Sequence, residues 1–180
     1  MESGSIAGFG WALRLGLVTF ALSCTFGPAA NAEIISLSAV DFVLRCSPLC
    51  QTSPEPDPSE VEKGVLKPFD IGTYFARVPF PANGLNVCSF ALIHQDKSDE
   101  NMTARLLRKV FKLGEPALNN PKVMAQVVSS GNSDNARRAK TTNINAAKIS
   151  QGNSFYYVEV DVNFNLRFLG VQIDVRPTCP

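Results

Sequence analysis

The sequence predicts an all-β protein, an antiparallel β-sandwich of about eight strands, of which a jelly roll is one form. The first observation is the alternation of apolar and polar residues between Ser154 and Val175, which is typical of half-buried strands. The second is the low share of charged residues, 18%, together with 12 Gly and 12 Pro, which favours a turn-rich β protein. The third is a series of short strand candidates with no regular alternation of strands and helices.

The N-terminus has the pattern of a signal peptide. Arg14 precedes an apolar run of 12 residues, Leu15 to Phe26. This run is too short to span a bilayer core of about 30 Å. Small residues at Ala30 and Ala32 fit a signal-peptidase site, with the mature chain beginning at Glu33.

A lipid anchor at Cys24 is an open alternative, although Ala21 stands where the lipoprotein pattern prefers leucine. We expect a signal peptide over 1–32 and one β-sandwich domain over 33–180. We also expect export to the periplasm, to the cell surface or into the medium, with no membrane span. Because the formal net charge is only +1, nucleic acid is not an expected partner.

Four further cysteines, Cys46, Cys50, Cys88 and Cys179, are candidates for disulfide bonds. An even number of cysteines in an exported chain indicates structural disulfides rather than free thiols. Cys46 and Cys50 could close a local loop while Cys88 meets Cys179, or Cys179 could hold the tail against the first strand. Zinc is a weaker alternative, because the C-x3-C spacing comes without paired histidines.

The N-terminal half contains three strand candidates and one long loop. Residues 40–45 form the first candidate, and a Pro-rich loop over 51–64 follows, because proline removes backbone donors. Residues 73–80 are expected near a sheet edge, since Pro79 interrupts the pattern. Residues 86–94 are apolar on both faces, which predicts a central strand covered on two sides.

The next segment, 99–113, fits either a helix or a strand. Ser98 could cap a helix, but the spacing of the neighbouring strands favours another strand. Further strands are expected over 123–130 and 142–149. Between them, 131–139 is expected to be a polar loop.

The last two strands are expected to form a hairpin around the turn Asn163–Asn165. Leu166 and Phe168 are apolar in one phase, whereas the residues from Leu169 onward are apolar in the other. A β-bulge beside Gly170 would explain this switch.

His94 is the only histidine, and a catalytic role would need a nucleophile and an orienting group beside it. No G-x-S-x-G motif accompanies it, so we expect a surface histidine and a protein that is not an enzyme. A hydrolase using His94 with nearby carboxylates is the alternative. Asp96, Asp99 and Glu100 are a weak calcium candidate, because Lys97 lies among them and a solvated acidic turn explains them equally. We expect no cofactor.

Two groups of residues are candidates for binding. Arg137 and Arg138, with Lys140, could hold a phosphate or an acidic glycan. Phe155 and Tyr157 share the outward face of their strand and could stack on a sugar, unless the proline loop or another subunit covers them. The sequence therefore predicts an exported binding or assembly module for a carbohydrate, a cell surface or further copies of itself. A structural subunit of an envelope assembly is the alternative.

Overall fold

The computed structural model of the chain describes the following residues: 32–44, 59–68, 72–96, 98, 100–111, 114, 120–163 and 165–180. The predicted leader, apart from Ala32, lies outside the described residues, as do Cys24, Cys46 and Cys50. Within the described part of the chain there are eleven strands and one short 3-10 helix. They are β1 (Glu33–Ser38), η1 (Ala39–Asp41), β2 (Val43–Leu44), β3 (Ser59–Glu62), β4 (Val65–Pro68), β5 (Gly72–Arg77), β6 (Asn86–Asp96), β7 (Thr103–Val110), β8 (Lys122–Val128), β9 (Arg137–Thr141), β10 (Ser154–Val162) and β11 (Leu166–Arg176).

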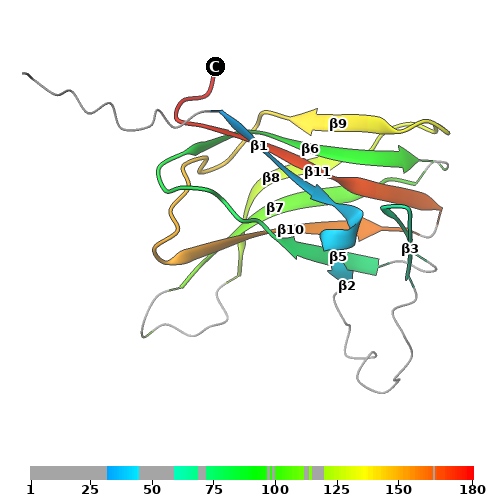
Figure 1. Cartoon of the computed structure of the whole chain (residues 1–180), viewed down its shortest axis with the longest axis horizontal. Helices are drawn as coiled ribbons and strands as arrows, with labels where there is room; N and C mark the ends of the chain where they lie inside the picture. Colours follow the sequence, from blue (N-terminus) through cyan, green and yellow to red (C-terminus); the bar gives the residue numbers. More distant parts are fainter. Residues whose placement is uncertain are drawn as a thin grey trace, which may run out of the picture.

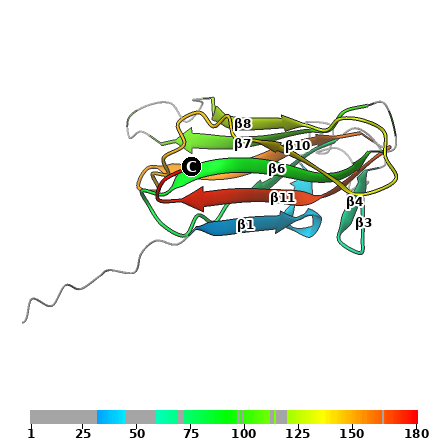
Figure 2. The same ribbon diagram turned by 90° about the horizontal axis from the view of Figure 1, so that it is seen from above.

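The strands form two antiparallel sheets (Figures 1 and 2). One sheet has the order β3-β4-β11-β6-β9, with β1 also paired to β11, and is called the β11 sheet below. The other has the order β2-β5-β10-β7-β8 and is called the β10 sheet. From β5 onward every connection changes sheet except the one between β7 and β8. This is the strand order of a jelly roll, so the predicted β-sandwich is confirmed.

The core lies between the two sheets and is built mainly from alternate residues of the strands. Along β10, Val158 and Val160 are fully buried, while the residues between them are half-buried on the outer face. Phe90 and Leu92 of β6 fill the same space from the opposite sheet. Because β6 lies between β11 and β9, the predicted central position in the sheet is confirmed, and the other sheet covers one of its two faces.

β10 and β11 lie in different sheets, so the predicted hairpin is wrong. The turn after Asn163 contains a hydrogen bond from the Leu166 amide to the Asn163 carbonyl, 3.0 Å long. It carries the chain across the core instead of pairing the two strands. A strand with one buried face has the same alternation whether its neighbour in sequence pairs with it or faces it across the core.

The bulge beside Gly170 is confirmed. Phe168 pairs with His94 and Gly170 pairs with Ile93, so Leu169 is the extra residue of β11. A bulge of this kind shifts the side-chain phase by one residue. It explains why Phe168 and Val171 both face the core although they are three positions apart.

The N-terminal strand prediction is wrong in its position. Residues 40–45 contain η1 and the two-residue β2, whereas the first long strand is β1, whose Ile35 and Leu37 are buried. The predicted loop over 51–64 is also shorter than expected, because 59–62 form β3 and pair with β4. Residues 51–58 lie outside the described residues.

The C-terminal half also contains confirmed strands and two corrections. The strand predicted over 123–130 is β8, Lys122–Val128. Residues 103–110 form β7, as the strand interpretation of 99–113 predicted. Residues 137–141 form β9 instead of a loop, held by backbone pairing with β6. Residues 142–149 are not a strand, and Lys148 makes only an isolated bridge to Asn86. Ile149 is buried nevertheless, which explains the apolar pattern that suggested a strand.

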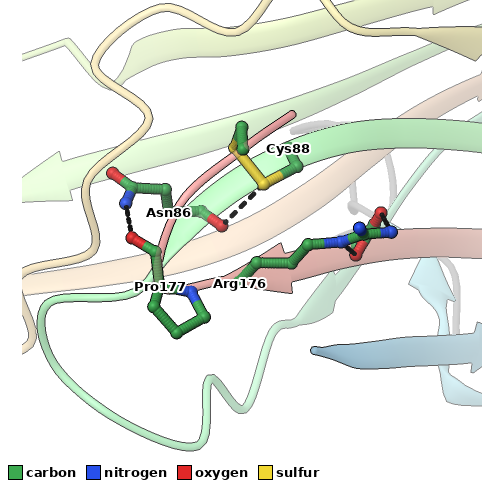
Figure 3. Close-up of a disulfide and its surroundings, with 6 residues drawn as sticks. Asn86, Cys88, Arg176 and Pro177 are labelled. Atoms are coloured by element: carbon green, nitrogen blue, oxygen red, sulfur yellow. Dashed lines mark hydrogen bonds and ion pairs between the residues drawn. A yellow bond between two sulfur atoms is a disulfide. The ribbon is translucent and has the colours of Figure 1, made fainter. Parts of the chain in front are cut away.

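A disulfide bond joins Cys88 to Cys179, one of the pairings that the sequence left open (Figure 3). Val87 pairs with Val175 and Ser89 with Asp174, so Cys88 occupies a second bulge, where its side chain is turned out of the regular alternation. The side-chain amide nitrogen of Asn86, Nδ2, also donates a hydrogen bond to the Pro177 carbonyl, 2.5 Å long. The C-terminal tail is therefore fastened to the first residues of β6.

Candidate binding surface

The outer face of the β10 sheet, which is turned away from the β11 sheet, is rich in apolar side chains. Seven large hydrophobic side chains are exposed in the described part of the chain, and five of them lie on this face. These five are Val43, Phe75, Phe111, Val123 and Val128. Monomeric proteins seldom leave large contiguous apolar patches in water unless the patch has a partner. This face is therefore the candidate binding surface.

Three aromatic rings form a row across this face. The rings of Phe111 and Phe155 are stacked, with centroids 5.0 Å apart and planes 27° apart. The ring of Tyr157 follows that of Phe155 at 5.7 Å and 31°. Phe155 and Tyr157 are half-buried, whereas Phe111 is 52% exposed at the end of the row. Of the three rings, that of Phe111 is therefore the most exposed to solvent.

A hollow of about 410 Å³ lies beside the row. Its polar lining comes from Arg77 at the end of β5, Gln151 before β10 and Ser154 at the start of β10. Hydrogen bonds hold two of these groups in place. The Gln151 side-chain amide donates to the Phe80 carbonyl (2.6 Å), and the Ser154 hydroxyl accepts from Arg108 Nε (3.1 Å). The hollow thus combines donors and acceptors with the neighbouring ring of Phe155.

Acidic groups occupy the other half of the outer face and are paired there. Arg105 contacts Asp161 at 2.6 Å and Glu159 at 3.3 Å. The Thr73 hydroxyl also donates to Asp161, 2.8 Å away. Partly exposed ion pairs like these contribute little to stability, but they do reduce the negative charge of this half of the face.

Arg137 and Arg138 do not join this surface. Both belong to β9, the edge strand of the β11 sheet, and not to the polar loop that the sequence predicted. Arg137 pairs with His94 on the side of the core, and Arg138 pairs with Ile93 on the outer side. Successive residues of a strand point to opposite faces, so the two guanidinium groups are not arranged as one anion-binding site.

His94 is buried, so the prediction of a surface histidine is wrong. Its side chain is 1% exposed at the core side of β6, and its Nδ1 has no hydrogen-bond partner in the described residues. Asp96 is also 1% exposed, and its carboxylate accepts from the Ser129 hydroxyl (3.0 Å) and the Ser98 amide (3.2 Å). Asp96 therefore does not orient the imidazole through Nδ1 as a catalytic dyad would require.

The burial of Asp96 also bears on the candidate calcium site of Asp96, Asp99 and Glu100. Asp96 lies on the core side of the strand instead of in an open turn, and Glu100 is exposed. Asp99 lies outside the described residues. In the described residues, no three side chains of His, Cys, Asp or Glu are grouped closely enough to bind a metal ion.

Burial of His94 gives an expected pH dependence of stability. Desolvation lowers the pKa of His94 below its usual value, nearby Asp96 opposes this shift, and Arg137 adds to it. The folded state then binds a proton less readily than the unfolded state does. The free energy of unfolding should fall as the pH is lowered below about 6.5.

Urea unfolding at pH 7.5, 6.5 and 5.5 measures this effect. A His94→Gln variant contains no imidazole, because His94 is the only histidine. We expect its stability to change less between pH 7.5 and 5.5 than that of the unchanged protein. Equal pH dependence in both proteins would assign the effect to other groups.

No protein-family model and no curated protein sequence matches the chain. Solved structures of similar shape include the CBM36-1 domain of a multidomain xylanase from the hindgut metagenome of Trinervitermes trinervoides. It has 11% identity and a TM-score of 0.41, with coverage of 81% of this chain and 96% of that chain. The xylan binding module CBM86 from Roseburia intestinalis has 9% identity and a TM-score of 0.37, with coverage of 81% and 96%. Eiger TNF from S. frugiperda has 13% identity and a TM-score of 0.37, with coverage of 84% and 90%.

Likeness at this level carries no information about the ligand of this chain. A search of the described residues for a helix long and apolar enough to cross a membrane finds none.

Sequence reasoning placed Phe155 and Tyr157 on the outer face but missed Phe111 and Arg77. The pairing register places both residues beside Phe155 and Tyr157. Arg77 lies opposite Tyr157, and Phe111 follows two residues after Lys109, which lies opposite Phe155. Residues 107, 109 and 111 lie on the same face of the chain as the outward residues of β10. The sequence alone does not reveal this, because it requires the register of β7 against β10.

Proposed function

We propose that this protein is a non-enzymatic glycan-binding module that works outside the cytoplasm. The observation that carries the proposal is the aromatic row of Phe111, Phe155 and Tyr157 beside a hollow with polar lining. A sugar ring has an apolar face of C–H groups and a rim of hydroxyls. Aromatic rings pack against the C–H face, and well-placed amide, hydroxyl and guanidinium groups hydrogen-bond to the hydroxyls.

The strand frame supports binding because it holds the aromatic row in place. Phe155 and Tyr157 project from β10, which is paired on both sides by β5 and β7. Side chains fixed in this way lose little conformational freedom when a ligand arrives. Export is supported by the Cys88–Cys179 bond, since disulfides persist mainly in oxidising compartments.

Replacing single rings of the row tests the proposal. We expect Phe111→Ala, Phe155→Ala and Tyr157→Ala each to weaken glycan binding by about 2- to 12-fold, as loss of a stacking contact of about 0.5–1.5 kcal/mol predicts. Isothermal titration against a panel of soluble neutral and acidic oligosaccharides measures the affinity. Ile34→Ala is the matched control, because Ile34 is 61% exposed but belongs to the β11 sheet.

Ile34→Ala should bind as the unchanged protein does, and all four variants should keep the far-UV circular dichroism of a β protein. Full affinity in the three ring variants would reject the aromatic row as the site. If Ile34→Ala lost as much affinity as the ring variants do, the loss would reflect a general effect on folding.

Association of two copies through the same face is a second candidate. It is favoured by the width of the apolar surface, because Val43, Val123 and Val128 extend it to β2 and β8 beyond the row. Homodimer interfaces are more apolar than other interfaces. Sedimentation velocity of the unchanged protein separates the two candidates, since a stable dimer burying this face would leave the row inaccessible to glycans.

A further inference from the structure

The charged side chains of the candidate binding surface are sorted along the strands. The acidic groups, Glu159 and Asp161, lie together beside Arg105. Toward the opposite end, where β10 begins, the outer face has Arg77 on β5 and Lys109 on β7. In Figure 1 this is the left-hand end of the sandwich.

Arg77 and Lys109 flank the aromatic row. Arg77 is the register partner of Tyr157, and Lys109 is the register partner of Phe155. Neighbouring strands lie about 5 Å apart and the two register positions differ by two residues, so the cations stand on either side of β10 at a backbone separation of roughly 12 Å. Neither side chain has a hydrogen-bond or ion-pair partner among the described residues.

More cations line two further hollows at the same end. Arg108 and Lys148 border a hollow of about 620 Å³, and Arg108 and Lys122 border one of about 240 Å³. Neither hollow has an Asp or Glu among its described lining residues. Arg108 also contacts Ser154, which lines the hollow beside Phe155. These cations add positive charge to this end of the sandwich, but Arg108 lies opposite Tyr156 in the inward phase of β7 and not on the outer face with Lys109.

We propose that the glycan bound at this site is anionic, with acidic groups supplied by uronic acids or sulfate esters. The inference rests on the proposed function and specifies its ligand class. Arg77 would bind a carboxylate or sulfate through paired N–H donors, and Lys109 would act as a second positive point on the other side of the row. The sugar rings between the acidic groups would lie against the aromatic row.

Binding of polygalacturonate fragments tests the proposal, with fully methyl-esterified fragments of the same length as the neutral control. We expect at least 10-fold tighter binding of the acidic fragments at 50 mM salt, and a smaller difference at 500 mM salt, because salt screens exposed charges. Heparin fragments form a second arm, which separates sulfate from carboxylate as the preferred group.

The double variant Arg77→Gln, Lys109→Gln should lose the preference for acidic fragments, so that acidic and esterified fragments bind with similar affinity. Arg138→Gln is the matched control, because it removes an exposed cation from the β11 sheet. An equal loss in Arg138→Gln would overturn the assignment to this site.

The remaining outcomes separate this inference from the proposed function. Tight binding of heparin alone supports an anionic ligand of the sulfate type. Equal binding of acidic and esterified fragments overturns the inference while the glycan-binding function stands. Absence of binding to every glycan, charged or neutral, rejects both.

Discussion

The double variant Cys88→Ser, Cys179→Ser is expected to lose about 2–5 kcal/mol of unfolding free energy. The two cysteines are 91 positions apart, so their bond closes most of the jelly roll, from β6 to the tail after β11, into one loop. Cutting a loop of this length increases the freedom of the unfolded chain much more than it changes the folded contacts. The urea midpoint of the variant, compared with that of the unchanged protein under oxidising conditions, measures the loss.

Two controls make the result specific. Asn86→Ala removes the hydrogen bond to Pro177 but keeps the disulfide, and should cost about 1 kcal/mol. A reducing agent should lower the stability of the unchanged protein by more than that of the double variant. If the double variant were as stable as Asn86→Ala, the bond would add nothing beyond fastening the tail.

The alternation of side chains identified β6, β10 and β11 from the sequence, because each buries one or both faces in the sandwich. It did not reveal which strands share a sheet. Val160 of β10 and Ile173 of β11 are both fully buried and point at the same core from opposite sheets. Strand pairing depends on contacts distant in sequence, and the Leu166–Asn163 turn suits a crossing as well as a hairpin.

The candidate site was only partly predictable for a related reason. Phe155 and Tyr157 could be placed on the outer face, because their own strand fixes their phase. Phe111 and Arg77 come from other strands and reach the site only through the register of β10 with β7 and β5. Arg137 and Arg138 were candidates because a cluster of charges can be seen in the sequence. Their position on the edge strand β9 cannot be seen there.

The buried His94 shows the limit of local patterns most directly. It ends an apolar strand and precedes Gln95 and Asp96, a polar run that resembles the start of a loop. In the structure β6 continues to Asp96, so His94 stays inside the sandwich opposite Phe168. A strand that is central in its sheet extends as far as its neighbours pair with it, whatever the polarity of its last residues.

Gly170→Ala is expected to lower the free energy of unfolding by about 3 kcal/mol, because it combines backbone strain with a collision. Gly170 has φ +153° at the bulge of β11, a conformation that residues with a side chain rarely adopt. An added Cβ would collide with the Leu37 carbonyl oxygen and lie 3.2 Å from the Ser38 Cα. Both contacts are backbone atoms of β1 and its end, which cannot rotate away as a side chain could.

Two other glycines separate strain from collision. Gly84 has φ +82° with no atom within 4 Å of an added Cβ, so Gly84→Ala should cost only about 1 kcal/mol. Gly152 has neither a positive φ nor a neighbour within 4 Å, and Gly152→Ala should be neutral. Urea midpoints give the three energies, and hydrogen exchange should show that only Gly170→Ala exposes the β1 amides. A cost for Gly170→Ala no greater than that for Gly84→Ala would mean that β1 can move away from β11 without loss.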